Sequence, residues 1–439
     1  MWTNEETVAA DHSIDPAHWQ TSFDALMARI AGRFSRVEPR RRAGRLVQGL
    51  LADLPRKNCW TIAEWAGEAT PDAMQHLLSR ARWDADGIRD DLRDYVAENL
   101  DDDQAVLVVD ETGDLKKGTT TVGAQRQYTG TAGRIENAQV AVYLVYAGKR
   151  GHAAVDRELY VPRSWTDAPR RCRAAGLPED RGFATKPRLA ETMIERFLAS
   201  GHRARWATGD EVYGANPRLR TALEEQRMGC VLAVSCSTAV PTATGRFQVR
   251  ELADRLPRAA WQPVSAGAGA KGQRVYDWAL VATAEAGPGH RSLLIRRNRA
   301  TGELAYYRCY SPEPASLGAL VAVAGMRWRV EETFQQTKGL AGLDEHQVRR
   351  YTSWTRWVTL AMLAHAFLAV LRTGADTGAR SDAAEMVPLS CNETQRLFLA
   401  LVADRVHHAD HRLCWSAWRR RHQARARRAH YRRRQAARP

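Results

Sequence analysis

The sequence predicts a multidomain α/β protein, because the period of its apolar residues changes along the chain. Residues 16–100 carry apolar side chains at helical spacing. From residue 104, short apolar runs that fit strands alternate with helical stretches, and residues 236–312 hold β-type runs between Gly- and Pro-rich breaks. Helical patterns return after residue 316. With 439 residues, the chain is long enough for several domains.

These changes of period set the domain boundaries that we expect. The expected parts are a helical N-terminal domain (1–103), the first part of an α/β core (104–235), a β-rich insertion (236–312), the C-terminal helices of the core (313–375) and a helical, Arg-rich C-terminal region (376–439).

Within the core, individual strands and helices follow from the apolar pattern and its breaks. We expect strands at 105–109, 138–146, 154–161, 204–208 and 229–235. We expect helices at 187–200, 215–226, 316–339, 354–373 and 393–404.

Composition excludes several classes of protein. No run of eighteen apolar residues suggests a membrane span, and the polar, acidic start of the chain does not fit a secretory signal. The seven cysteines are scattered without a CxxC pair, which argues against a zinc ribbon or a disulfide scaffold. We therefore expect a protein of the reducing cytoplasm, with no membrane partner.

The charge of the chain predicts a polyanionic partner. The formal net charge is +15, and residues 415–439 are dense in arginine and contain no acidic residue. Trp415, Trp418, His422 and Tyr431 interleave with these arginines. Arginine binds phosphate through a planar fork and stacks on bases, so the tail favours nucleic acid. The alternative is a solvated basic tail without a specific role.

Carboxylates follow two of the expected strands. The apolar run Val106–Val109 leads into Asp110, with Glu111 and Asp114 close behind, and the run at 204–208 leads into Asp210 in the stretch GDEVYG. Either group could be an ordinary polar turn, since Asp and Gly suit turns for local reasons. Two such groups, each directly after a separate apolar run, are less easily explained by chance.

A third stretch, GMRWRVEETFQQTKG (325–339), supplies a charged helix face. Arg327, Glu331 and Lys338 are four and seven residues apart, which places them on one side of a helix. Val330, Phe334 and Trp328 are expected on the apolar side. The ordinary alternative is an amphipathic helix with an Arg–Glu ion pair.

Together these stretches resemble a known family. The order of strands and helices resembles the RNase-H-like fold, a mixed sheet with helices on both faces. The pattern R-W-x-V-E-E-x-F with a later Lys resembles the Arg-Glu-Lys signature of bacterial transposases with a DDE active site. The phrases VVDETGDLKKG, QYTGTAGRIENAQV, DRELYVP, GDEVYG and RWRVEETF look most like the insertion-sequence 701 family. One departure is Ala324, where a tyrosine is usual in the wider group.

The resemblance implies roles for particular residues. Asp110, Asp210 and Glu331 take the positions of the catalytic carboxylates, which hold two Mg²⁺ ions that Mn²⁺ can replace. Arg327 and Lys338 take DNA-contacting positions. We also expect contacts with DNA from two further groups of basic residues, which are Lys116 and Lys117 after the first strand and Arg419, Arg420 and Arg421 in the tail.

The function implied is cut-and-paste DNA transposition. The partners would be double-stranded DNA, both transposon ends and target, and a second copy of the chain in the active complex. The N-terminal helical domain would bind DNA. Two alternatives stay open: a catalytically silent or domesticated DNA-binding protein, and a structural or RNA-processing nuclease.

Overall fold

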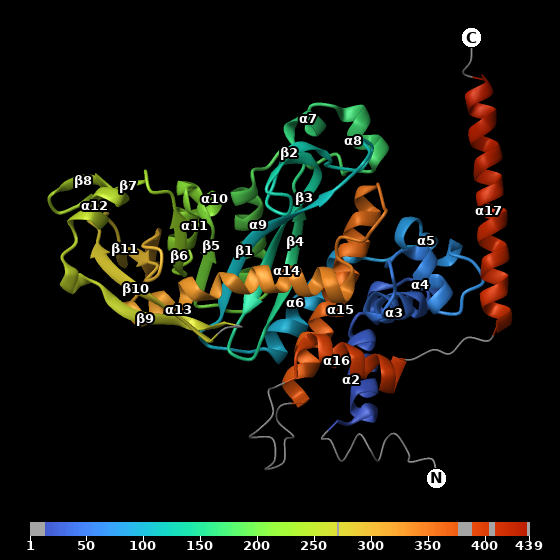
Figure 1. Ribbon diagram of the computed structural model, residues 1–439, viewed down its shortest axis with the longest axis horizontal. Helices are drawn as coiled ribbons and strands as arrows, with labels where there is room; N and C mark the ends of the chain where they lie inside the picture. The colour runs from blue at the N-terminus through green and yellow to red at the C-terminus, as the bar shows by residue number, and fades with distance from the viewer. Residues whose placement is uncertain (1–13, 270–271, 376–388, 404–408, 437–439) are drawn as a thin grey trace. The chain divides into compact units, whose positions relative to one another are not determined.

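The computed structural model describes residues 14–269, 272–375, 389–403 and 409–436 of the chain (Figure 1). The chain forms two compact units. The helical unit comprises residues 1–85, 337–348 and 352–439, and the sheet unit comprises residues 86–336 and 349–351. The consecutive domain boundaries expected from the sequence stay a prediction.

The helical unit is built from segments at both ends of the chain. Its elements are α2 (Pro16–Arg29), the short 3-10 helix η1 (Ala31–Arg33), α3 (Val37–Leu51), α4 (Cys59–Trp65), α5 (Asp72–Ser79), most of α15 (Tyr351–Ala375), α16 (Cys391–Phe398), the π-helical turn η5 (Leu399–Ala403) and α17 (Ala409–Ala436). Aromatic rings join distant segments, since Phe23 of α2 contacts both Phe367 of α15 and Phe398 of α16.

Helix α15 lies at the centre of this unit. Residues 351–374 are the one span in the described part of the chain that is long and apolar enough to cross a membrane by length and composition. However, 83% of its most apolar window is buried inside the protein. The side chain of Arg356 points inward too and donates to the carbonyl oxygens of Leu77 and Ala81. Helix α15 is therefore buried as the core helix of a globular unit is.

The Arg-rich tail forms helix α17, and its first turns pack on α4. The indole of Trp415 is 1% exposed and donates to the carbonyl oxygen of Glu68 at 2.7 Å. Trp418 and His422 both contact the ring of Trp60, with centroids 4.8 Å apart in each case. The expectation that Trp415 meets nucleic acid among the arginines of the tail is therefore wrong, because its ring is buried and hydrogen-bonded to Glu68, which keeps it from any ligand.

The sheet unit contains a ten-stranded mixed sheet, which confirms the predicted fold class. Its first elements are α6 (Ala85–Asn99), β1 (Val106–Leu115), β2 (Gln125–Thr129), β3 (Arg134–Ala147), β4 (His152–Leu159), α7 (Arg163–Thr166), α8 (Pro169–Ala175), α9 (Lys186–Ala199), β5 (Trp206–Gly209), α10 (Glu211–Gly214), α11 (Pro217–Glu225) and β6 (Gly229–Val234). The strand order is β2-β3-β1-β5-β6-β12-β11-β10-β9, with β4 also paired to β3.

Strands β4, β3, β1, β5 and β6 form the RNase-H-like core of this sheet. β1 pairs antiparallel with β3 and parallel with β5, and β5 pairs parallel with β6. Helices lie on both faces. Phe197 of α9 contacts Tyr146 on one face, whereas Phe334 of a later helix contacts Tyr143 on the other, since these tyrosines differ by an odd number of positions in β3.

The insertion does not stand apart from the core, because its strands extend the same sheet. It comprises β7 (Ala239–Thr242), β8 (Gly245–Gln248), α12 (Val249–Arg255), η2 (Arg258–Ala260), β9 (Gln262–Gly269), β10 (Gly272–Ala282), β11 (His290–Arg297) and β12 (Leu304–Ser311). β12 pairs antiparallel with β6, so β12 to β9 continue the sheet beyond it (Figure 1). Only β7 and β8 form a separate two-stranded sheet among the described residues.

The long helix expected at 316–339 is broken into α13 (Leu317–Met326) and α14 (Trp328–Ala341), with Arg327 at the break. Just before it, the carbonyl oxygen of Gly325 accepts from Arg274 Nη2 of β10 at 3.3 Å, a partner outside the helix. Gly325 also packs tightly on β9, because a Cβ there would collide with the carbonyl group of Ala266. The position expected on the apolar side, Trp328, is instead 48% exposed.

Candidate active site in the sheet unit

Asp110 and Asp210 lie side by side on adjacent parallel strands. Val109 of β1 pairs with Gly209, the last residue of β5, and each aspartate is the next residue along its chain. Asp210 caps helix α10, and its Oδ1 accepts from the backbone N–H of Val212 at 2.9 Å. The sequence-based expectation that these two acids meet at one edge of the two strands agrees with this register.

Strand β1 itself continues past Asp110, contrary to the expectation that it ends at Val109. The β5 partner stops at Gly209, but β3 still pairs with β1 as far as Leu115. Antiparallel pairing on one side is thus enough to keep Asp110 to Asp114 extended despite their turn-like sequence. Asp110 sits just past the point where β1 loses its β5 neighbour.

Burial and mutual repulsion act on both carboxyl groups. Burial, the nearby Asp210 and the adjacent Glu111 raise the pKa of Asp110 to about 7, against a usual value near 4. The pKa of Asp210 is raised as well, by burial and by Glu111. Arg327 acts in the opposite direction on both groups, which places its positive charge near them. A site with this much negative charge is suited to bind a cation.

Glu111 points to the opposite face of β1 and is held there. Its carboxylate forms an ion pair with Lys186 at the start of α9 and accepts from the hydroxyl of Tyr213 in α10 at 2.6 Å. The phenol is buried and hydrogen-bonded to a carboxylate, so the pKa of Tyr213 is raised well above its usual value. Sequence reasoning missed Tyr213 and Lys186, although Tyr213 lies in the quoted stretch GDEVYG.

Helix α14 lies over the face of the sheet that carries Asp110. Tyr143 is the direct partner of Asp110 in the β1–β3 ladder, so the two side chains share a face. The ring of Phe334 in α14 contacts Tyr143, with centroids 5.4 Å apart. Glu331 is three residues before Phe334 and therefore on the same side of the helix. Its carboxylate accepts from Arg327 Nη2 at 3.2 Å.

The neighbouring acid, Glu332, is directed elsewhere. Its carboxylate binds Arg329 Nη1 at 2.6 Å and lies 3.5 Å from Nε2 of the buried His152. The same ring bonds Thr333 through Nδ1 at 2.7 Å. Successive helical residues point about 100° apart, and here this separates Glu332 from the Arg327 side of α14.

Among the described residues, no group of three or more His, Cys, Asp or Glu side chains has the geometry to hold a metal ion. The structure thus brings Asp110 and Asp210 together with Arg327, while Glu331 is turned to its ion pair with Arg327. The three-carboxylate set stays a prediction.

The other basic residues expected to contact DNA lie outside this cluster. Lys338 forms an ion pair with Asp344 at 3.9 Å, and Lys116 forms one with Asp114 at 3.8 Å. Lys117 is exposed. In α17, Arg419 is bound to Glu64 of α4 at 2.5 Å, whereas Arg420 and Arg421 are exposed.

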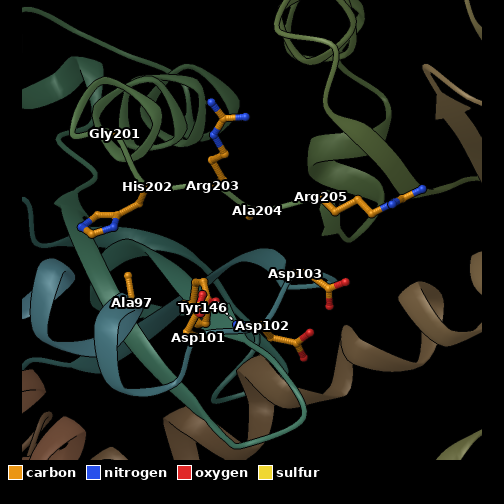
Figure 2. A pocket seen from close by; sticks show the side chains of 10 residues that line it. All are labelled: Ala97, Asp101, Asp102, Asp103, Tyr146, Gly201, His202, Arg203, Ala204 and Arg205. Atoms are coloured by element: carbon orange, nitrogen blue, oxygen red, sulfur yellow. Dashed lines mark hydrogen bonds between the residues drawn. The ribbon is translucent and has the colours of Figure 1, made fainter.

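A cavity of about 500 Å³ in the sheet unit is separate from this site (Figure 2). Asp101, Asp102 and Asp103 line it from the segment before β1, and His202, Arg203 and Arg205 line it from the segment before β5. These segments enter the strands at the end opposite to Asp110 and Asp210. The hydroxyl of Tyr146 accepts from the backbone N–H of Asp102 at 3.1 Å at the base of the cavity.

Comparison with known proteins agrees with this site. The family model described as "DDE superfamily endonuclease" matches residues 29–275, more than half of the chain. The chain belongs to this family. The matched region includes Asp110 and Asp210 of this DDE endonuclease, whereas Glu331 lies beyond its end.

A curated relative gives a narrower likeness. The chain is 29% identical over 189 residues to a protein of Microchaete diplosiphon named "Probable transposase for insertion sequence element IS701". The aligned part covers 42% of this chain and 46% of the relative. The resemblance to this family noted from the sequence is confirmed, and the chain is matched to less than half of the relative's length.

Proposed function

We propose that this DDE endonuclease is a transposase, which binds the ends of an insertion sequence and catalyses DNA strand cleavage and strand transfer. The observation that carries the proposal is the pair Asp110 and Asp210, two buried carboxylates in register on adjacent strands with Arg327 beside them. Negative charge builds up on the attacking and leaving oxygens during phosphodiester cleavage, and a cluster of carboxylates contributes by holding cations that would stabilise this charge.

The donor set fits divalent metal ions of the magnesium type. Asp110 and Asp210 offer hard oxygen ligands, and their mutual repulsion favours a cation between them. We infer that two Mg²⁺ ions, or Mn²⁺ in their place, bind here with Glu331 as the third carboxylate. When bound, such ions activate the attacking hydroxyl group or water and stabilise the leaving oxygen.

Glu331 has to leave Arg327 to reach this position. The two side chains are about a third exposed, and an exposed Arg–Glu pair on a helix is worth well under about 1 kcal/mol. A change of the Glu331 rotamer therefore costs little free energy. In the proposed complex a DNA phosphate takes the place of the carboxylate on Arg327, whose guanidinium binds phosphate through two parallel N–H groups.

The proposed partners are double-stranded DNA, at the transposon ends and at the target, and a second copy of the chain. Lys338, Lys116, Lys117 and the arginines of α17 would contact the backbone. We place the reaction in the bacterial cytoplasm, on nucleoid DNA. The net charge of +15 supports a polyanionic partner, since phosphate contacts dominate the affinity of such proteins for DNA.

The first experiment removes each carboxylate without changing its size. Asp110→Asn, Asp210→Asn and Glu331→Gln should each lower metal-dependent cleavage of an element-end duplex by at least about a thousandfold, because each change removes a metal ligand. Binding of the same duplex should change little. Cleavage products on a denaturing gel and fluorescence anisotropy measure the two properties.

Glu332→Gln is the matched control. Because Glu332 faces Arg329 and His152, this change should leave cleavage within a few-fold of the parent protein. If Glu331→Gln cleaved fully and Glu332→Gln did not cleave, Glu332 and not Glu331 would be the third metal ligand. If the parent protein bound DNA but never cut it with Mg²⁺ or Mn²⁺, the catalytically silent alternative would hold. Stronger competition by RNA than by DNA would favour an RNA-processing nuclease.

A further inference from the structure

The strand pairing that aligns Asp110 and Asp210 stops one residue before them. Val109 and Gly209 are the last partners of β1 and β5, after which β1 continues and the other segment turns into α10. The register thus brings the two backbones together but does not extend to the two carboxylates. Both groups are buried close together, and like charges in such a place repel each other. A contact beyond the last strand pair would oppose this repulsion.

One hydrogen bond joins β1 to α10 just beyond the last strand pair. The hydroxyl of Tyr213 donates to Oε2 of Glu111 at 2.6 Å. Glu111 directly follows Asp110, and Tyr213 is the third residue after Asp210. Because successive residues of a strand point to opposite faces, this bond lies on the face of the sheet opposite to the side chain of Asp110. It therefore connects the two segments that carry the aspartates from the side away from the Asp110 carboxylate.

The ring of Tyr213 has little freedom to move. It is fully buried and packs against Gly209, where an added Cβ would lie 3.2 Å from the Cβ of Tyr213. Helix α10 also lies directly on β6, because a Cβ at Gly214 would collide with the carbonyl oxygen of Ala233. The backbone of α10 therefore sets the position of the phenol hydroxyl, and the hydrogen bond transmits this position to β1.

A second partner fixes the orientation of Glu111. Its carboxylate forms an ion pair with Lys186, the first residue of α9, and both side chains are largely buried. The glutamate also adds a negative charge close to Asp110 and Asp210. A contact that only packed the core would not require this charge. As a hydrogen-bond acceptor, however, a carboxylate binds a phenol more strongly than a neutral group does.

We propose that Tyr213 is a positioning residue of the metal site and, through Glu111, holds Asp210 beside Asp110 before any metal binds. The inference rests on the proposed metal site but concerns residues that are not themselves ligands. With the hydrogen bond in place, a divalent ion meets both carboxylates already close together. Without it, the two carboxylates move apart, and the ion has to bring them together again. The affinity for the ion falls by the free energy that this ordering costs.

Tyr213→Phe tests the proposal, because it keeps the ring and removes only the hydroxyl. Binding of Mn²⁺ to the full-length protein without DNA is followed by loss of the electron paramagnetic resonance signal of the free ion. We expect Tyr213→Phe to bind Mn²⁺ about ten- to a hundredfold more weakly than the parent protein, the usual effect of removing a group that orients metal ligands. Asp110→Asn in the same titration identifies the site that is measured.

Tyr146→Phe is the matched control. Tyr146 is a buried tyrosine of β3 in the same unit, and its hydroxyl makes a hydrogen bond with Asp102 at the other end of the sheet. This variant should bind Mn²⁺ as the parent protein does. Glu111→Gln keeps an oxygen that accepts from Tyr213, so it should bind Mn²⁺ more tightly than Glu111→Leu. Equal affinities in these two variants would overturn the proposal.

The dependence of cleavage on metal separates positioning from a purely structural role. At saturating Mn²⁺, the ion itself holds the carboxylates together, so Tyr213→Phe should cleave DNA within a few-fold of the parent rate. Its half-maximal rate should require about tenfold more Mn²⁺. The same loss of rate at every Mn²⁺ concentration, with lower stability in urea, would show that the hydroxyl only supports the fold.

Failure of the inference and failure of the proposed reaction give different results. Unchanged Mn²⁺ affinity in Tyr213→Phe, with cleavage that still requires Asp110, would overturn the inference and keep the reaction. A parent protein that binds Mn²⁺ through Asp110 and Tyr213 but never cuts DNA would keep the inference and overturn the transposase. Mn²⁺ binding that Asp110→Asn leaves unchanged would overturn both, because the ion would then bind elsewhere.

Discussion

At the scale of single residues, buried ionisable side chains decide how the protein responds to pH. His365 lies in α15 at the centre of the helical unit and is fully buried. Burial, with a smaller contribution from Arg372, lowers its pKa to about 4 from a usual value of 6.5. The fold therefore favours the neutral imidazole.

The sign of the pH effect follows from this shift. The unfolded chain binds a proton at His365 below about pH 6.5, whereas the folded protein does so only near pH 4. Stability contributed by the neutral ring is complete above pH 6.5 and is lost as the pH falls towards 4. Between pH 7 and pH 5 the loss amounts to about 2 kcal/mol.

We expect His365→Gln, which cannot titrate, to remove this part of the pH dependence. Urea unfolding of the parent and the variant at pH 7 and pH 5 measures it. His18→Gln, a change at an exposed histidine of α2, should behave like the parent protein. Parallel losses of stability in the parent and in His365→Gln would show that the ring is not the group responsible.

At the scale of elements, helix α17 divides into two parts with different tasks. Its first part, up to His422, is anchored to α4 by Trp418 and Arg419 and to Glu68, just after α4, by Trp415. In the described residues after His422, arginine side chains are exposed and Tyr431 is half exposed. This second part is available to bind a partner along its length, and Arg420 and Arg421 are exposed just before it.

Removal of residues 423–439 should therefore weaken binding to every DNA sequence about equally and leave the anchor intact. The slope of log affinity against log salt should become shallower by about 0.9 for each phosphate that the truncated protein no longer neutralises. Titrations of DNA at several salt concentrations measure this slope. A variant with Gln in place of the arginines of 423–434 keeps the helix and removes its charge, so it separates the two contributions. An unchanged slope with a defect in assembly would instead identify a protein-binding helix.

The same elements show what sequence patterns can and cannot predict. Apolar periodicity predicted β3, β5, β6 and α9 to within a few residues because their own side chains fill the core. It missed β2 and ended β1 too early, because Gly113 and Asp114 are typical of turns and only the partner strand β3 keeps them extended. The dense arginines around Trp415 led to its being placed on the DNA side, because the hydrogen-bond partner of its indole lies 347 positions earlier in the chain.

The candidate site was predicted to a similar degree. Asp110 and Asp210 could be paired from sequence, because each follows an apolar run and the resemblance to the RNase-H-like fold places those two strands side by side. The contacts of Lys186 and Tyr213 with Glu111 could not be predicted. The three residues lie in three different elements, and no sequence pattern links them. The orientation of Glu331 depends on a rotamer, which spacing along a helix does not determine.

At the scale of the sheet unit as a whole, the insertion is hydrogen-bonded to the end of α13, the helix just before the one that carries Glu331. Arg274 Nη2 in β10 donates to the carbonyl oxygen of Ala266 in β9 at 3.1 Å and to that of Gly325 in α13 at 3.3 Å. It thus ties two strands of the insertion to the break before Arg327. We expect the position of Arg327 relative to Asp110 to depend on these two hydrogen bonds.

We expect Arg274→Met to lower the rate of cleavage by about tenfold or more while DNA affinity changes little. Methionine keeps the apolar stem of the side chain but removes both hydrogen bonds, so the break can shift without loss of the sheet. Single-turnover rates and anisotropy measure the two effects. Arg297→Met, which removes an ion pair with Asp277 in the same sheet, serves as the control. Equal cleavage rates in both variants would show that Arg274 does not position the break.

The ion pair between Arg327 and Glu331 bears on how a nuclease can coexist with its host chromosome. In the proposed mechanism, the cluster of acids lacks its third member while the guanidinium holds the carboxylate of Glu331, so the enzyme at rest would cut poorly. A phosphate that binds Arg327 competes with Glu331 for the same donors, so arrival of DNA and completion of the cluster become thermodynamically linked. Each is favoured by the other to the same extent. Restraint and activation would then reside in a single arginine, without any separate inhibitor.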